Sequence, residues 1–211
     1  MGFKQTIKNW KQYSKLSDLG EIARRKFFNN CFDGALTCAG IISGFFITFL
    51  NPKAPVFTPQ NVLIMGFATA LAIGISGLWG AYLSEEAERK KKVSDMKKEM
   101  AMVDDEDKEE KNNPHKTLLE KAESFATIVA SLVDGGAPVL GSSLPLIPFF
   151  FGGTLTLSHF IFSYIILIGL LVYLGIYLGK ISGGGRARYA IHLVMAGVVT
   201  LIVTLLLGQI T

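Results

Sequence analysis

Long apolar stretches alternate with short polar segments along this chain. A run of about 18 or more apolar residues can cross the roughly 30 Å hydrocarbon layer as a helix. Four runs meet this requirement, at residues 62–83, 124–144, 157–178 and 189–207. Only the second contains a charged residue, Asp134, and a fifth, less regular span covers residues 27–50. The pattern predicts an all-α integral membrane protein with five transmembrane helices.

The positions of the basic residues predict how these spans are oriented. Lys and Arg are retained on the cytoplasmic side of membrane proteins. Of the 21 Lys and Arg residues, 20 precede the first span, separate spans two and three, or lie between spans four and five, and only Lys53 lies in an opposite connection. We therefore expect a cytosolic N-terminus and an external C-terminus. The net charge of +4 follows from this topology and indicates no nucleic-acid partner.

Composition divides the chain into four segments. Residues 1–26 form a cytosolic arm with lysines at helical spacing, predicted to lie along the lipid bilayer. Residues 27–84 hold transmembrane helices 1 and 2, and residues 124–211 hold helices 3 to 5. Between them, residues 85–123 form a charged insert with 10 basic and 13 acidic residues, predicted to be helical and cytosolic.

An internal repeat joins the two halves. Asp33-Gly34 is followed by a glycine after five further residues, and Asp134-Gly135 shows the same pattern 101 residues later. Helices 1 and 2 therefore resemble a duplicate of helices 3 and 4, with helix 5 added. Both copies begin on the cytosolic side, so the duplication is parallel, and such halves commonly place a transport path at their interface.

The two repeated aspartates are candidates for binding a cation or a proton. Asp134 is residue 11 of the 21 in its span, which predicts a position near the bilayer centre, where a carboxylate costs at least about 2.5 kcal/mol. No Lys or Arg lies deep enough in a span to pair with it, so a proton or a metal ion is the simplest counter-charge. Alternatively, Asp134 caps a broken helix or bonds a neighbouring helix, and Asp33 is an interfacial N-cap. Pro138 also frees a backbone carbonyl that could face an ion.

These motifs together resemble the vacuolar iron transporter family, which includes plant and yeast vacuolar iron and manganese transporters and prokaryotic relatives. The similar elements are Phe-Asp-Gly-Ala-Leu-Thr at 32–37, Gly-Ala-Tyr-Leu-Ser-Glu at 80–85, the charged insert, and Asp134-Gly135 in the third span. Gly77 and Ala81 stand where better-known members have a methionine and a glutamate. The chain is thus similar to a divergent member.

The resemblance implies a homodimer that exports Fe²⁺, or Mn²⁺ or Co²⁺, from the cytosol in exchange for protons. The membrane would be the cell membrane in a prokaryote and the vacuolar membrane in a eukaryote. No permanently bound cofactor is implied, because the metal is cargo. The candidate transport path consists of Asp33, Gly34, Thr37, Asp134, Gly135 and Pro138.

The charged insert contains candidate ligands for capturing a metal. With Asp33 of the first span, the candidate metal ligands are Glu85, Glu88, Glu99, Met100 and Met102. Carboxylates suit Mg²⁺, Mn²⁺ and Fe²⁺, whereas thioethers favour softer ions. The acids between 104 and 110 could concentrate cations. Alternatively the insert is a solvated helical hairpin, in which Glu85 with Arg89 and Glu86 with Lys90 are ordinary i, i+4 pairs.

No constellation typical of a soluble enzyme occurs in the sequence, so we expect a protein that is not an enzyme. Two other functions remain open. One is a transporter or channel for another solute, whose aspartates bind only protons. The other is a membrane scaffold whose insert binds a protein partner.

Overall fold

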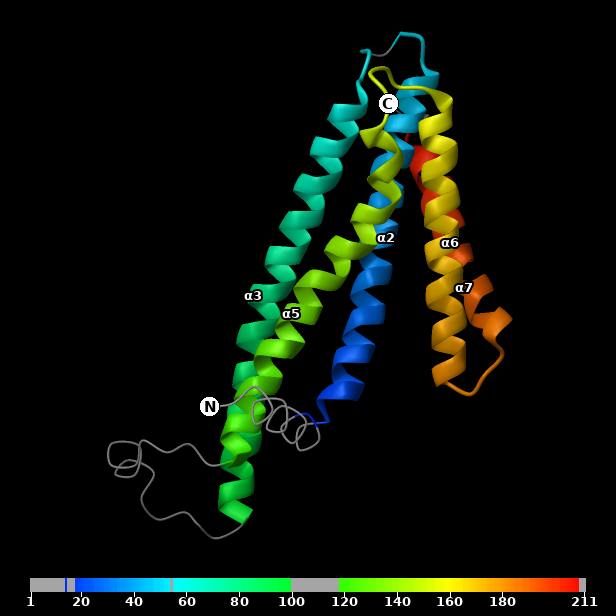
Figure 1. Cartoon of the computed structure of the whole chain (residues 1–211). Helices are drawn as coiled ribbons and strands as arrows, with labels where there is room; N and C mark the ends of the chain where they lie inside the picture. Colours follow the sequence, from blue (N-terminus) through cyan, green and yellow to red (C-terminus); the bar gives the residue numbers. More distant parts are fainter. Residues whose placement is uncertain (1–13, 15–17, 54, 100–117, 209–211) are drawn as a thin grey trace. The chain divides into compact units, whose positions relative to one another are not determined.

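The computed structural model describes residues 14, 18–53, 55–99 and 118–208 (Figure 1). Within these residues every regular element is a helix. In chain order the elements are α2 (Leu19–Leu50), α3 (Pro59–Glu99), α5 (Leu118–Leu146), the 3₁₀-helix η1 (Ile147–Phe150), α6 (Leu157–Ile181) and α7 (Arg186–Gly208). The five α-helices are all long and apolar enough to cross a membrane. The predicted five-helix membrane fold is confirmed.

Two of the helices extend well beyond their apolar spans. At 1.5 Å per residue, the 32 residues of α2 and the 41 of α3 measure about 48 and 61 Å, more than a bilayer core requires. The first part of the charged insert is thus helical, as expected, because α3 continues to Glu99. Since α2 begins at Leu19, Asp33 lies deep within a helix. The alternative that Asp33 is an N-cap was wrong.

The chain divides into two compact units, which are described separately. Unit 1 contains Met1–Lys26 and Ser76–Gly135, and unit 2 contains Phe27–Ile75 and Gly136–Thr211. The border between 26 and 27 coincides with the first border predicted from composition. The others fall within predicted spans, because α3 and α5 each contribute residues to both units.

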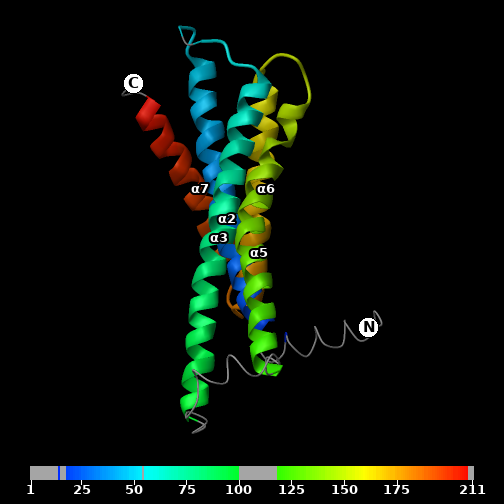
Figure 2. The same cartoon turned by 90° about the vertical axis from the view of Figure 1, so that its left-hand side faces the viewer.

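Unit 2 is held together by apolar and aromatic side chains. Its main buried cluster consists of Cys38, Ile42, Val62, Leu146, Phe149 and Phe160. The connection from α2 to α3 and that from η1 to α6 lie at the same end of this unit, and α6 packs beside α7 (Figures 1 and 2). Gly175 and Gly179 permit this pairing, since a Cβ at either position would meet the backbone of α7.

Helices α2 and α5 touch through their backbones in unit 2. A Cβ on Gly34 would overlap the carbonyl oxygen of Pro138, and one on Gly141 would overlap that of Cys31. The Ser142 hydroxyl reinforces the crossing by donating to the carbonyl oxygens of Gly34 at 3.0 Å and Pro138 at 2.7 Å. Close crossings through small residues are a common way to associate helices in lipid.

Unit 1 has a smaller apolar core. Leu19 packs against Ala126 and Ala130, with half-buried side chains around them. Farther along the same two helices Lys26 contacts Asp134, so α2 and α5 run in the same direction. A parallel duplication of the chain requires this relation.

Candidate functional site

A chain of ion pairs connects three helices within unit 1. The Lys26 ammonium of α2 lies 3.2 Å from Asp134 Oδ2 on α5 and 3.3 Å from Glu85 Oε1 on α3. The other Glu85 oxygen, Oε2, accepts from Arg89 Nε at 3.1 Å. Arg89 Nη1 also bonds Glu123 Oε2 on α5, and Lys92 Nζ lies 3.2 Å from Glu123 Oε1. Positive and negative groups therefore alternate, and the set is electrically balanced.

The centre of this chain is removed from solvent. The side chains of Arg89 and Glu123 are 8% and 4% exposed, and that of Glu85 is 13% exposed. By contrast, the predicted pair between Glu86 and Lys90 is present at 2.8 Å but lies at the surface. A buried charge is tolerated only when it is paired and hydrogen-bonded. Each member of the buried chain therefore depends on its neighbours.

The partner of Asp134 corrects one expectation from the sequence. Asp134 pairs with Lys26, a residue that the sequence predicts to lie outside the spans and too far from Asp134 to pair with it. The pairing occurs because α2 is helical from Leu19, so Lys26 is on an ordered turn and its four-carbon stem reaches α5. The candidate third span is also longer than predicted, Lys121–Phe150, and Asp134 still lies near its middle. The alternative that Asp134 bonds a neighbouring helix is confirmed.

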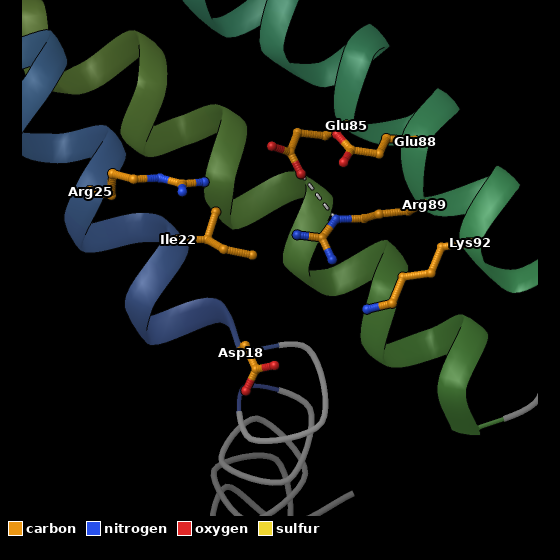
Figure 3. Close-up of a pocket in the computed structure, with 7 residues that line it drawn as sticks. All are labelled: Asp18, Ile22, Arg25, Glu85, Glu88, Arg89 and Lys92. Atoms are coloured by element: carbon orange, nitrogen blue, oxygen red, sulfur yellow. Dashed lines mark hydrogen bonds and ion pairs between the residues drawn. The ribbon is translucent and has the colours of Figure 1, made fainter.

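A pocket of about 170 Å³ adjoins this chain of ion pairs (Figure 3). It is lined by Asp18, Ile22, Arg25, Glu85, Glu88, Arg89 and Lys92. Figure 3 shows Glu85, Glu88, Arg89 and Lys92 extending from α3 and Ile22 and Arg25 from α2. The three acids and three bases of the lining balance in charge. Carboxylate oxygens and ammonium or guanidinium groups therefore face the same space, so the pocket has donors for a hard cation and competitors for it.

The structure brings some of the predicted metal ligands together and leaves others apart. Glu85 and Glu88 line this pocket, whereas Asp33 belongs to unit 2. The side chain of Glu99, both Met100 and Met102, and the acids between 104 and 110 lie outside the described residues. In the part of the chain that the structure describes, no group of three or more His, Cys, Asp or Glu side chains is arranged to hold a metal ion.

Asp33 occupies an exposed position on the apolar part of α2 in unit 2. Among the described residues its carboxylate has no hydrogen bond or ion pair, while its backbone carbonyl accepts from Thr37 Oγ1 at 2.9 Å. Gly40 and Gly44 lie within about 60° of Asp33 around the helix axis, and a Cβ on either would meet nothing within 4 Å. No described residue therefore covers this polar face of small residues on α2.

The small residues of the candidate path serve helix packing in this structure. Gly34 and Pro138 form the backbone crossing in unit 2. In unit 1, a Cβ on Gly77 would lie 3.1 Å from the carbonyl oxygen of Asp134 and 3.4 Å from the Cα of Gly135. The carbonyl of Asp134 lacks its usual helical hydrogen bond, because Pro138, four residues later, has no N–H to donate. It faces α3, and a longer side chain at position 77 has no room beside it.

Sequence reasoning missed three members of the ion-pair chain, Lys26, Lys92 and Glu123. A signal for the first was present: the parallel repeat places the starts of spans one and three at one level. The run of three basic residues that ends at Lys26 directly precedes span one. Asp134 is the acid that follows the start of span three. Glu123 gave no such signal, because it resembles the other acids of the insert.

Comparison with known proteins gives one relative and no family. No protein-family model matches the chain. It is 28% identical over 166 residues to an uncharacterized protein of Methanocaldococcus jannaschii, a match that covers 77% of this chain and 76% of the relative. The alignment therefore spans most of both proteins, while the relative brings no activity, ligand or partner.

Proposed function

We propose that this protein is a divergent member of the vacuolar iron transporter family that exports divalent cations from the cytosol in exchange for protons. Fe²⁺ is the expected cargo, together with Mn²⁺ or Co²⁺. The observation that carries the proposal is the exposed carboxylate of Asp33 in the middle of an apolar helix. A carboxylate within a transmembrane segment is costly and is retained for an ion, a proton or a specific partner.

The surroundings of Asp33 favour a cation over a purely structural partner. The described residues supply no donor to its side chain, so a proton or a metal ion would provide the missing compensation. A carboxylate that exchanges a bound proton for a bound metal ion has the chemistry that a proton-coupled carrier requires. In the sequence resemblance, Asp33 matches by position the membrane aspartate of the family's first helix.

The donor set bears on which ions are carried. Glycine and alanine have no donor atom in their side chains, so positions 77 and 81 supply neither a thioether nor a carboxylate to a path. Asp33, Glu85 and Glu88 are oxygen donors, and such ligands suit Mn²⁺ and Fe²⁺ better than soft ions. We therefore expect Mn²⁺ to be carried alongside Fe²⁺.

A homodimer explains the uncovered face of α2. Asn29, Asp33, Gly40 and Gly44 share one side of the helix at separations of 4, 11 and 15 residues from the first. Small residues of this kind let two helices approach closely in lipid. A second copy packed on this face would bring two Asp33 carboxylates beside a shared path.

The distribution of basic residues indicates which side of the membrane is cytosolic in this proposal. The helix bounds leave Lys53 as the one basic residue of the connection between α2 and α3, while the connection between α3 and α5 belongs to the charged insert. The positive-inside rule then puts the insert in the cytosol. Glu85 and Glu88 would meet cytosolic ions, and Asp33 would carry them through the membrane.

Metal flux into proteoliposomes tests the proposal. The purified protein is reconstituted without oxygen, a pH gradient is imposed, and uptake of Fe²⁺, Mn²⁺ and Co²⁺ is followed. We expect gradient-driven uptake that Asp33→Asn abolishes. The matched control is Asp95→Asn, which makes the same change at an exposed acid of α3. Folded wild-type protein that moves none of these ions under either gradient polarity would contradict the proposal.

A further inference from the structure

Lys26 occupies an unusual position between two carboxylates. Its ammonium nitrogen lies 3.2 Å from an oxygen of Asp134 and 3.3 Å from an oxygen of Glu85. The two acids come from α5 and α3, and the lysine comes from α2. All three side chains are at most 20% exposed. A single positive charge thus connects three helices at a site largely withdrawn from water.

Two carboxylate oxygens converging on one point are also what a hard divalent cation binds. We infer that Lys26 is a tethered counter-ion, whose ammonium holds the place between Glu85 and Asp134 that a divalent cation takes when the lysine withdraws. The binding step stands on these distances alone, whereas its part in export rests on the proposed function.

The neighbouring ion pairs keep the two-carboxylate arrangement in place when the lysine leaves. Glu85 is held through its other oxygen by Arg89, and Arg89 is held in turn by Glu123. These contacts join α3 to α5 without Lys26. A cation arriving between Glu85 and Asp134 therefore finds one ligand already oriented, which lowers the entropic cost of binding.

Lysine suits the role of a displaceable cation. Its charge sits at the end of a flexible stem, so rotation about the side-chain bonds moves it several ångströms, as a planar guanidinium fixed by two bonds does not. Displacement would release α2 from α3 and α5 at this point while leaving the other pairs intact. Metal binding is thereby coupled to the attachment of α2.

Replacing the lysine tests this assignment in the full-length protein. Mn²⁺ is titrated against wild type and Lys26→Met in detergent, and the thermal unfolding midpoint is recorded. Removing the competing ammonium should lower the half-saturating Mn²⁺ concentration by roughly tenfold. Adding Asp134→Asn to the variant should abolish the gain. The matched control is Lys98→Met, which makes the same change at an exposed lysine of α3 that belongs neither to the ion-pair chain nor to the pocket lining. Equal half-saturation in wild type and Lys26→Met would overturn the inference.

A second measurement needs no substitution and so covers the case in which the variant does not fold. Lysines of the wild-type protein are acetylated with a water-soluble ester, with and without saturating Mn²⁺, and the labelling of each is quantified by mass spectrometry. Mn²⁺ should raise labelling of Lys26 severalfold and leave the labelling of the exposed Lys98 unchanged. Constant labelling of Lys26 would refute the displacement.

These results separate the inference from the proposed function. Protein that carries no metal across proteoliposomes but binds Mn²⁺ more tightly without Lys26 would retain the site and lose the transport proposal. Protein that carries metal with unchanged binding in Lys26→Met would retain transport and lose the role of the lysine.

Discussion

The two units of this protein are stabilised in different ways although three helices contribute to both. In unit 1, α2, α3 and α5 are connected by alternating charges, beside a small apolar cluster formed by Leu19, two alanines and their half-buried neighbours. In unit 2, α2 and α5 meet backbone to backbone at Gly34 and Gly141. Interlocked backbones have one arrangement, whereas ion pairs can exchange partners when a charge arrives or leaves. Unit 1 is therefore the part of the molecule suited to respond to ions.

The strongest test of this contrast removes a buried acid from unit 1. Glu123→Ala should lower the free energy of unfolding by about 3 kcal/mol, because Arg89 then keeps a buried charge with one fewer partner. Unfolding would be followed by titration with sodium dodecyl sulfate. The control is Glu88→Ala, which removes an exposed acid of α3. Equal stability of the two variants would show that the chain of ion pairs does not hold unit 1.

A smaller effect is expected when the backbone crossing of unit 2 is disturbed. Gly141→Ala places a methyl group against the carbonyl of Cys31 and should cost about 2 kcal/mol. Gly169→Ala provides the comparison, since a Cβ there meets nothing within 4 Å, and it should gain roughly 0.5 to 1 kcal/mol as an ordinary helical substitution. The same detergent titration measures both. A neutral Gly141→Ala would mean that α2 and α5 can separate at this point without loss.

The smallest effect should come from the surface pair of α3. Glu86→Gln removes the partner of Lys90, whose side chain is 76% exposed, and should change stability by less than about 0.5 kcal/mol. High salt should erase even this difference, because exposed pairs are screened. A loss as large as that of Glu123→Ala would break the distinction between buried and surface charges in unit 1.

The sequence predicted the membrane fold because its main determinant is local. Apolar runs of sufficient length specify spanning helices whatever they pack against, and all five were found. Helix ends were less predictable, since charged residues such as Arg24 and Arg25 are compatible with either a helix or a connection, and here α2 includes them. Helical propensity alone does not decide between the two.

The candidate site was predictable only in part. The i, i+4 pair of Glu85 and Arg89 followed from spacing along one helix and is present at 3.1 Å. The pair of Lys26 and Asp134 joins residues 108 positions apart, and its formation depends on the crossing of α2 and α5 and on the reach of a long side chain. Neither the helix crossing nor the reach of the Lys26 side chain across it can be predicted from the sequence of a single helix. The role of Asp33 as an ion-binding residue stays a prediction.

The same separation in sequence governs how the protein can be made. Gly34 and Ser142, like Lys26 and Asp134, are 108 residues apart, so α2 leaves the ribosome long before the segment that completes its contacts. At about 5 to 20 residues per second the delay is on the order of 5 to 20 s. During that time Asp33 and the bare surface of Gly34 face lipid or the insertion machinery. A newly made α2 therefore reaches its final contacts only after α5 has been synthesised.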